Sequence, residues 1–157
     1  MRPVKKVSDS LTEQQYLIRP THINHYGRLF GGQLIYWIDE LAGIVATRHC
    51  GAIVTTAAID NLQFRAPAYE GDLVVLQGMV TNVGRSSMEI RVDTFREALD
   101  GTRVMINRAY IDMVAIDSEG RPVEVPDLLI ETEEEKQEQQ AAIKRKALRK
   151  QRRQEGF

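Results

Sequence analysis

The sequence contains little of what secreted and membrane-spanning proteins use for stability or anchoring. It has a single cysteine, Cys50, among 157 residues, which excludes an intrachain disulfide framework and is typical of a reducing compartment. The first ten residues, MRPVKKVSDS, contain no apolar run of the kind found in a signal peptide. The longest apolar region, Leu34–Val45, is interrupted by Asp39 and Glu40 and is too short to cross a bilayer. We therefore expect a cytoplasmic protein without a membrane partner.

The sequence also lacks a strong excess of either charge. Its 21 basic and 22 acidic side chains leave a formal net charge of −1. Residues 1–130 hold 13 basic and 16 acidic side chains, whereas residues 131–157 hold 8 and 6. A slightly acidic body argues against nucleic acid as a partner. The 157 residues suffice for one globular domain and an appendage.

The order of predicted elements places one long helix before a run of strands. The helix covers residues 32–50 and ends before Gly51, which suits a left-handed C-cap. A short strand at residues 14–18 precedes it, and four long runs rich in β-forming residues follow at residues 53–65, 72–83, 87–98 and 103–116. Long strands joined by short turns form a curved sheet. The sequence therefore predicts an α+β fold, in which a long central helix is wrapped by an antiparallel sheet of about five strands.

The C-terminal segment differs in composition from the rest of the chain. Residues 131–157 are helix-prone, with acidic residues first and basic residues last, as the helix dipole favours. Their apolar side chains are few, so we expect a poorly packed and partly frayed helix. The predicted organisation is a flexible N-terminus at residues 1–13, a compact domain at 14–130 and a charged helical tail at 131–157.

The central helix carries an acid that requires explanation. Burying an ionised carboxylate without partners costs several kcal/mol or more, roughly, so Asp39 is predicted to face a cleft and take part in chemistry. Helical spacing places it on a stripe with Gly32, Tyr36, Gly43 and Ala46, which are small apart from the tyrosine. A structural acid, salt-bridged or capping a loop, is the alternative. Neighbouring Glu40 is the other candidate for the functional acid, but it does not lie on the stripe of small residues.

The start of the same helix offers backbone donors. Gly31 and Gly32 would let a carbonyl oxygen approach unpaired N–H groups at the positive end of the helix dipole, although a plain tight turn would also explain them. The two turns between these amides and Asp39 correspond to roughly 11 Å along the axis. A two-fold dimer with antiparallel helices would bring the amides of one chain to the acid of the other. We therefore predict a shared active site.

Several sequence blocks together resemble one known family. They are N-x-x-G-x-x-F-G-G from Asn24, then W-I-D-E, A-T-R-H-C, T-T-A-A-I-D-N-L-Q-F-R-A-P and V-G-R-S-S-M. Their order and spacing closely resemble the hotdog-fold acyl-CoA thioesterases, in the branch of the cytosolic acyl-CoA hydrolases. The resemblance covers about Gln15 to Pro126 and leaves out the tail. Tyr26 and Arg28 depart from it, because relatives often have smaller or different residues there.

The resemblance implies both an assembly and an activity. It implies a hotdog domain whose dimer joins two sheets into one, often with three dimers in a hexamer, and it implies hydrolysis of fatty acyl-CoA to free fatty acid and coenzyme A. The family's functional Asn falls on Asn24 and its functional acid on Asp39, supplied to one site by opposite subunits. The thioester-polarising amides fall on Gly31 and Gly32.

The resemblance also implies a site for the coenzyme A moiety. The loop V-G-R-S-S lies where relatives commonly contact it, at Gly84, Arg85, Ser86 and Ser87. These residues offer a positive charge, two hydroxyls and free loop amides for phosphate. An ordinary exposed hairpin turn is the alternative explanation of this segment.

The chemistry that these residues suit is thioester hydrolysis. Asn24 would hold water or the acyl oxygen, and Asp39 would act as a general base on water or attack directly to give a mixed anhydride. The three histidines are not at metal-ligand spacing, so no metal and no cofactor beyond coenzyme A itself is expected. Two alternatives stay open, a non-catalytic module that senses acyl-CoA and a hotdog hydratase or dehydratase. The basic tail is a solvated helix, or it contacts coenzyme A, another subunit or an acidic partner.

Overall fold

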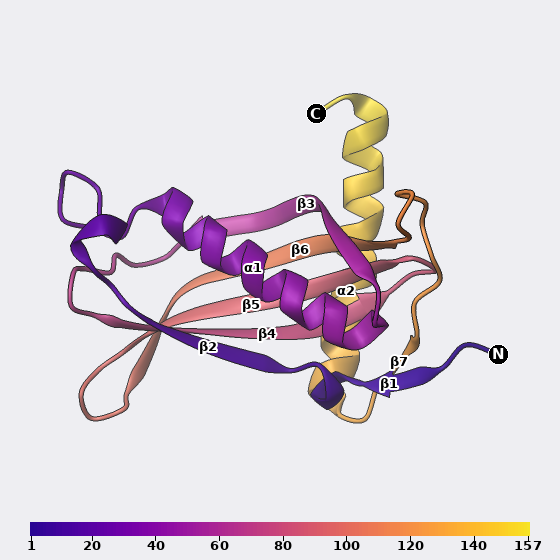
Figure 1. Cartoon of the computed structure of the whole chain (residues 1–157), viewed down its shortest axis with the longest axis horizontal. Helices are drawn as coiled ribbons and strands as arrows, with labels where there is room; N and C mark the ends of the chain where they lie inside the picture. The colour runs from indigo at the N-terminus through magenta and orange to yellow at the C-terminus, as the bar shows by residue number, and fades with distance from the viewer.

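One helix of 20 residues, α1 (Gly31–Cys50), lies against one face of a curved five-stranded antiparallel sheet (Figure 1). The structure is a computed structural model and describes residues 1–157 apart from the side chain of Asn61. The strands follow the order β2-β4-β5-β6-β3. Their bounds are β2 (Thr12–Leu17), β3 (Ile53–Phe64), β4 (Leu73–Val83), β5 (Ser87–Glu97) and β6 (Arg103–Ile116). The predicted α+β hotdog fold, with a central helix and about five strands, is confirmed.

Alternation of side chains, which is clearest along β5, divides the sheet into an apolar inner face and a charged outer face. On β5, Met88 and Ile90 are fully buried beneath α1, whereas the intervening Glu89 faces away from it. Helix α1 contributes Leu41 and Val45 to the same core. Successive side chains of a strand point to opposite faces, so each long strand serves both layers. The core therefore lies between α1 and the concave side of the sheet.

The N-terminal residues are more ordered than the sequence suggests. Val4–Lys6 form strand β1, which pairs in parallel with β7 (Asp127–Leu129), and the 3₁₀ turns η1 (Val7–Asp9) and η2 (Pro20–His22) flank β2. An ion pair of 3.0 Å between Arg2 and Asp127 stabilises the pairing of β1 with β7. The sequence did not predict this strand within residues 1–13, because its pairing partner lies more than 120 residues away and one valine followed by two lysines carries no strand pattern of its own.

The C-terminal helix lies on the outer face of the sheet. Helix α2 (Glu133–Glu155) is continuous, and a capping box between Thr132 and Glu135 fixes its first turn. Few apolar contacts hold it, as expected, since Ala142 is its one buried residue. The prediction of a frayed helix is wrong, because ion pairs to the sheet replace the missing apolar contacts. Among the residues described, neither helix combines the length and apolarity that crossing a membrane demands.

Helix α1 lies close to the sheet at Gly78 of β4. A Cβ atom at this position would lie 2.9 Å from Cγ2 of Val45 and 3.2 Å from Cγ of Leu41. Both of these side chains are fully buried, so neither has open space into which to move.

We expect Gly78→Ala to destabilise the protein by about 1–3 kcal/mol, because the added methyl overpacks the contact between α1 and β4. Denaturant unfolding would measure this difference. Gly43→Ala is the matched control, since its Cβ would lie 3.7 Å from Cε of Met113 in ordinary contact and the helix would gain up to about 1 kcal/mol. Equal stability of Gly78→Ala and the wild type would contradict the tight contact.

A second prediction concerns His49, a fully buried residue in the last turn of α1. Its Nε2 lies 2.9 Å from the Pro126 carbonyl oxygen, and within the described structure its Nδ1 has no partner. Burial lowers the pKa of His49 below that of the unfolded chain. Protons therefore favour the unfolded state. The stability that His49 contributes is complete above about pH 6.5 and is lost as the pH falls from there towards the lowered folded-state pKa.

Thermal unfolding between pH 8 and pH 5 would measure this loss. We expect His49→Gln, which keeps a donor for Pro126 but does not titrate, to show a shallower decline than the wild type. Because both proteins retain every other titratable group, the difference between the curves isolates His49. Parallel curves would show that His49 does not contribute to the pH dependence.

Candidate active site

The carboxylate of Asp39 is held at the open edge of the sheet. Its Oδ1 accepts a hydrogen bond of 2.6 Å from the Thr56 hydroxyl. Thr56 lies on β3, which ends the sheet on one side, and it is exposed, whereas Asp39 is half-buried on α1. A short bond to an ionised acceptor fixes the direction of the carboxylate. Asp39 is thus oriented, yet accessible from the side on which β3 has no neighbour in the described structure.

The structure separates Asp39 from its competitor Glu40. The Tyr16 hydroxyl lies 3.2 Å from Glu40 Oε1, on the side of α1 that faces β2. The Tyr16 ring stacks on Trp37 with centroids 4.3 Å apart, and burial raises the pKa of Tyr16 to about 12. Glu40 therefore contacts the β2 side of the sheet through Tyr16, whereas Asp39 contacts β3 through Thr56.

The predicted stripe of small residues is only partly open. Ala46 is fully buried in the core, so it does not share the exposed lane with Asp39. Gly43 does lie on the surface of α1, where it lines a shallow apolar groove with Ile44 and Val54. Helical spacing placed Ala46 on the same stripe as Asp39, but Ala46 lies on the face of α1 that packs on the sheet.

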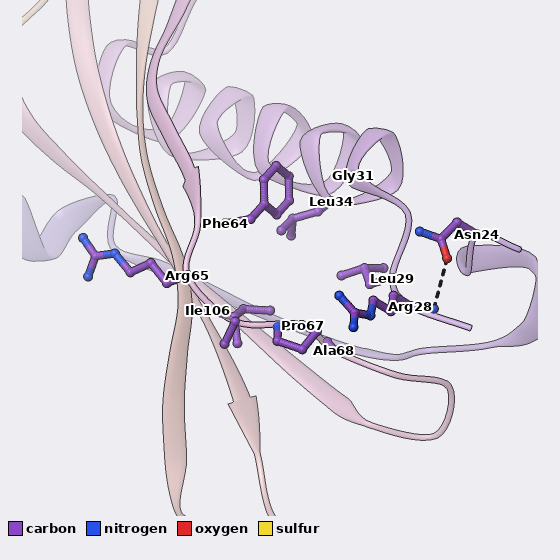
Figure 2. A pocket seen from close by; sticks show the side chains of 11 residues that line it. Asn24, Arg28, Leu29, Gly31, Leu34, Phe64, Arg65, Pro67, Ala68 and Ile106 are labelled. Carbon is purple, nitrogen blue, oxygen red and sulfur yellow. Dashed lines mark hydrogen bonds between the residues drawn. The ribbon is translucent and has the colours of Figure 1, made fainter. Parts of the chain in front are cut away.

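Two of the other predicted residues, Asn24 and Gly31, line a cavity of about 390 Å³ near the start of α1 (Figure 2). The cavity is lined by Asn24, Arg28, Leu29, Gly31, Leu34, Phe64, Arg65, Ala66, Pro67, Ala68 and Ile106. Asn24 Oδ1 accepts from the backbone N–H of Tyr26 at 2.9 Å and from that of Arg28 at 3.2 Å. Two backbone donors require an acceptor, which assigns the oxygen and leaves the Asn24 NH₂ group as a donor.

The helix start presents backbone donors to the same cavity. The N–H groups of Gln33 and Leu34 donate to the Phe30 carbonyl at 3.0 and 3.2 Å. Those of Gly31 and Gly32 precede the first helical bonds and have no acceptor within the helix. A Cβ at Gly31 would lie 3.3 Å from the Phe64 ring, and one at Gly32 would lie 2.5 Å from the Phe30 ring. A side chain at either position would therefore have to displace an aromatic ring, and of the two glycines only Gly31 is among the described lining residues.

Within one chain these groups form two separate half-sites. Asp39 and Thr56 lie together, and Asn24 and Gly31 lie together, but Asp39 is not among the described residues that line the cavity. On β6, Met113 pairs with Thr56 and Asn107 pairs with Phe64. These six residues of extended strand correspond to roughly 20 Å. A single chain therefore does not assemble the predicted site.

The predicted coenzyme A loop lies at the Asp39 end of the sheet. Gly84 N–H donates to the Ser87 carbonyl at 2.8 Å, and the Gly84 carbonyl accepts from Arg2 at 2.8 Å. Ser87 pairs with Val114, next to the row that contains Thr56. A Cβ at Gly84 would lie 2.9 Å from the Lys146 ammonium, so α2 brings a second positive charge beside Arg85. Sequence reasoning did not associate Lys146 with this loop.

Thr56 is the residue at the site that sequence reasoning did not single out. It stands in the quoted block T-T-A-A-I-D, but two adjacent threonines are ordinary in a strand. Pairing across the sheet supplies the missing information, since Thr56 pairs with inward-facing Met113 and Thr55 with its neighbour Val114. In the part of the chain that the structure describes, no three His, Cys, Asp or Glu side chains gather in a way that could hold a metal ion.

Comparisons with known proteins identify the family of the chain. The thioesterase superfamily model matches residues 26–100. An uncharacterized acyl-CoA thioester hydrolase of Bacillus subtilis is 41% identical over 134 residues, which cover 85% of this chain and 78% of that protein. The chain belongs to the acyl-CoA thioester hydrolases. Hydrolysis of acyl-CoA is thereby favoured over the sensing module and the hydratase that the sequence left open.

Solved thioester hydrolases share the whole fold. An acyl-CoA hydrolase of Staphylococcus aureus, solved with butyryl coenzyme A and coenzyme A, has a TM-score of 0.93 and 35% identity, covering 98% of this chain and 94% of that one. A hexameric acyl-CoA thioesterase has a TM-score of 0.91 and 39% identity, covering 96% and 97%. The rat cytosolic acyl coenzyme A thioester hydrolase is longer, since the match spans 35% of its length.

Proposed function

We propose that the protein hydrolyses fatty acyl-CoA to free fatty acid and coenzyme A in sites shared between two subunits. Asp39 of one subunit and Asn24 of the other act on the same thioester. The observation that carries this proposal is the carboxylate of Asp39 held by Thr56 at the open edge of β3, because it leaves an oriented acid next to a surface that a second chain would cover.

The arrangement of β3 supports the shared site. Near its start, Thr56 contacts Asp39, and near its end, Phe64 lies over Gly31. An antiparallel pairing of two β3 strands, with its two-fold axis near Asp60, would place Thr56 of each chain opposite Phe64 of the other. The acid of one subunit would then face the helix start and the Asn24 amide of its partner. The roughly 20 Å between the half-sites of one chain would be bridged without moving either.

The chemistry requires few groups because a thioester is already reactive. Backbone N–H groups at Gly31 and Gly32, with the Asn24 NH₂ group, would stabilise the negative charge that develops on the thioester oxygen. Asp39 would take a proton from the attacking water, or would attack the carbonyl carbon itself and form an anhydride that water then cleaves. The C–S bond breaks, the thiolate of coenzyme A leaves, and the acid is released. No cofactor beyond the coenzyme A of the substrate takes part.

Binding and assembly follow the same plan. We propose that Gly84, Arg85, Ser86 and Ser87 bind the phosphates of coenzyme A, since this loop lies at the Asp39 end of the sheet and carries an exposed guanidinium. We also propose that three dimers form a hexamer, as the hexameric relative suggests. A cytoplasmic location is supported by the relatives named cytosolic hydrolases.

Variants of the Staphylococcus aureus enzyme support the choice of residues. Structures of that enzyme carry alanine in place of an Asn, an Asp and a Thr. Those three positions are separated along its chain by the same intervals as Asn24, Asp39 and Thr56 here. The same three side-chain types thus recur at matching spacing in a chain with the same fold.

Mixing two impaired variants tests the shared site. We expect Asp39→Ala to lose at least about tenfold in kcat, and Asn24→Ala to lose less. A heterodimer of the two would contain one fully intact site, because the surviving Asp39 meets the surviving Asn24 across the interface. Random reassociation of equal amounts should make about a quarter of all sites intact, so thiol release from a fatty acyl-CoA should rise above the mean of the two variants. The control is each variant reassociated alone. If the mixture shows only the mean activity of the two variants, each site lies within one chain.

Replacing the threonine tests the orientation of the acid. We expect Thr56→Val to lower kcat by about tenfold with little change in KM, because Asp39 loses the hydrogen bond that directs it while the side-chain volume is kept. Thr55→Val is the matched control on the adjacent residue of the same strand. Comparable kcat values for both variants would show that the hydroxyl does not position Asp39.

A further inference from the structure

Helix α2 crosses the outer face of the sheet towards the open edge at β3. Glu138 pairs with Arg91 of β5 at 2.9 Å, Arg145 pairs with Glu89 of β5 at 2.8 Å, and Arg152 pairs with Asp60 of β3 at 2.9 Å. The contacts therefore move from the middle of the sheet to its edge as the helix proceeds. Figure 1 shows the C-terminal turns of α2, in yellow, extending past the edge of the sheet at β3.

The direction of this helix is fixed by buried ion pairs. The Glu89 side chain is 3% exposed and is paired with both Arg145 and Arg149, while the Arg145 guanidinium also lies 3.6 Å from the centre of the Tyr110 ring. Removing one member of such a group would leave a buried charge without a partner, which costs several kcal/mol, roughly. The end of α2 is thus held rigidly beyond the edge.

Two hollows lie beneath and beside this projecting end. One, of about 270 Å³, is bounded by Ala57–Asp60 of β3 and by Arg149, Arg152, Arg153 and Phe157 with Asp112. The other, of about 430 Å³, is bounded by Asp60, Arg145, Leu148, Gln151, Arg152, Glu155 and Phe157. Leu148 and Phe157 are 56% and 83% exposed beside them. A single chain therefore leaves apolar side chains without neighbours at the edge where a partner is proposed to join.

The two hollows lie where a second copy of the chain would join the sheet at β3. The three helical residues that follow Arg152, up to Glu155, reach about 4.5 Å past the last ion pair, which is close to the about 4.8 Å at which the next strand of a continuous sheet would lie from β3. A partner strand at this edge would therefore pass beneath the end of α2. Because the proposed two-fold axis lies near Asp60, which α2 itself contacts, the partner's α2 would cross the same axis in the opposite direction.

We infer that the C-terminal turns of α2, from Leu148 to Phe157, form an arm that crosses the seam between two copies and packs against the outer face of the partner at its β3 and α2. The inference rests on the proposed two-fold pairing of β3. The arm would slow separation of the two subunits whose half-sites together form each active centre. Helix α2 is then an interface element, rather than a solvated tail.

The rate of subunit exchange tests the arm. We expect Leu148→Glu to accelerate exchange at least about tenfold, because a charge in an apolar contact mainly raises the dissociation rate. Ile143→Glu is the matched control, since Ile143 lies on the same helix with the same 56% exposure but is not among the described residues that line the two hollows. Both side chains are exposed, so neither substitution removes core packing, and thermal unfolding would verify the fold of each variant.

Exchange can be measured without relying on activity. Native mass spectrometry of mixed isotope-labelled and unlabelled full-length chains follows it directly, and recovery of thiol release from mixed Asp39→Ala and Asn24→Ala proteins in each background follows it a second time. Faster exchange in Leu148→Glu alone would support the arm, even if the mixed variants recover no activity, in which case the shared site alone is wrong. Equal exchange rates in Leu148→Glu, Ile143→Glu and the wild type would overturn the arm. A higher KM for acyl-CoA with unchanged exchange would also overturn it, and would assign the end of α2 to substrate binding.

Discussion

The constraint on which the rest of the structure depends is an acid fixed at an unpaired sheet edge. A carboxylate on an apolar helix would be unfavourable inside the core, and Asp39 avoids that cost by lying half-exposed where β3 ends the sheet. The 2.6 Å bond from Thr56 ties the helix to this edge. The same edge strand then meets Gly31 through Phe64 and meets α2 through Asp60. The start of α1, the carboxylate of Asp39 and helix α2 thus all contact β3. Pairing of β3 with a second copy would therefore complete the site.

Two shifts in the pairing register of β3 allow this strand to contact both α1 on the inner face of the sheet and α2 on the outer face. The pairing with β6 shifts between Thr56 and Ala58, and again between Asp60 and Gln63. In a regular strand, Thr56 and Asp60 would share a face because they are four residues apart. The first shift turns Asp60 to the outer face, where it meets Arg152, while Thr56 stays on the inner face with Asp39. Bulges at sheet edges commonly redirect side chains near functional sites.

The sequence predicted most elements because their patterns are local, and it missed what depends on distant pairing. Runs of β-forming residues between turn signals located the four long strands to within one residue, and the Gly-Gly pair located the start of α1. Asn24 was predicted as a site residue from the family resemblance, and Asp39 also from the cost of an acid on an apolar helix. By contrast, the roles of Thr56 and Asp60 depend on bulges, for which β3 has no local signal. Strand β1 was missed because its partner β7 lies at the far end of the domain.

The charged character of α2 follows from where it lies. The outer face of β5 carries Glu89, Arg91 and Asp93, because these residues alternate with the apolar residues of the inner face. An apolar helix on this face would leave these charges without partners. A basic helix neutralises these acids, and the pairs form only in one register, because Arg145 and Arg149 must both reach Glu89. Burial of paired charges contributes little net stability compared with apolar packing. The ion pairs do fix the position of α2 on the sheet. The projecting end of α2 must be held in that position if it is to contact a second copy across the edge that carries Asp39.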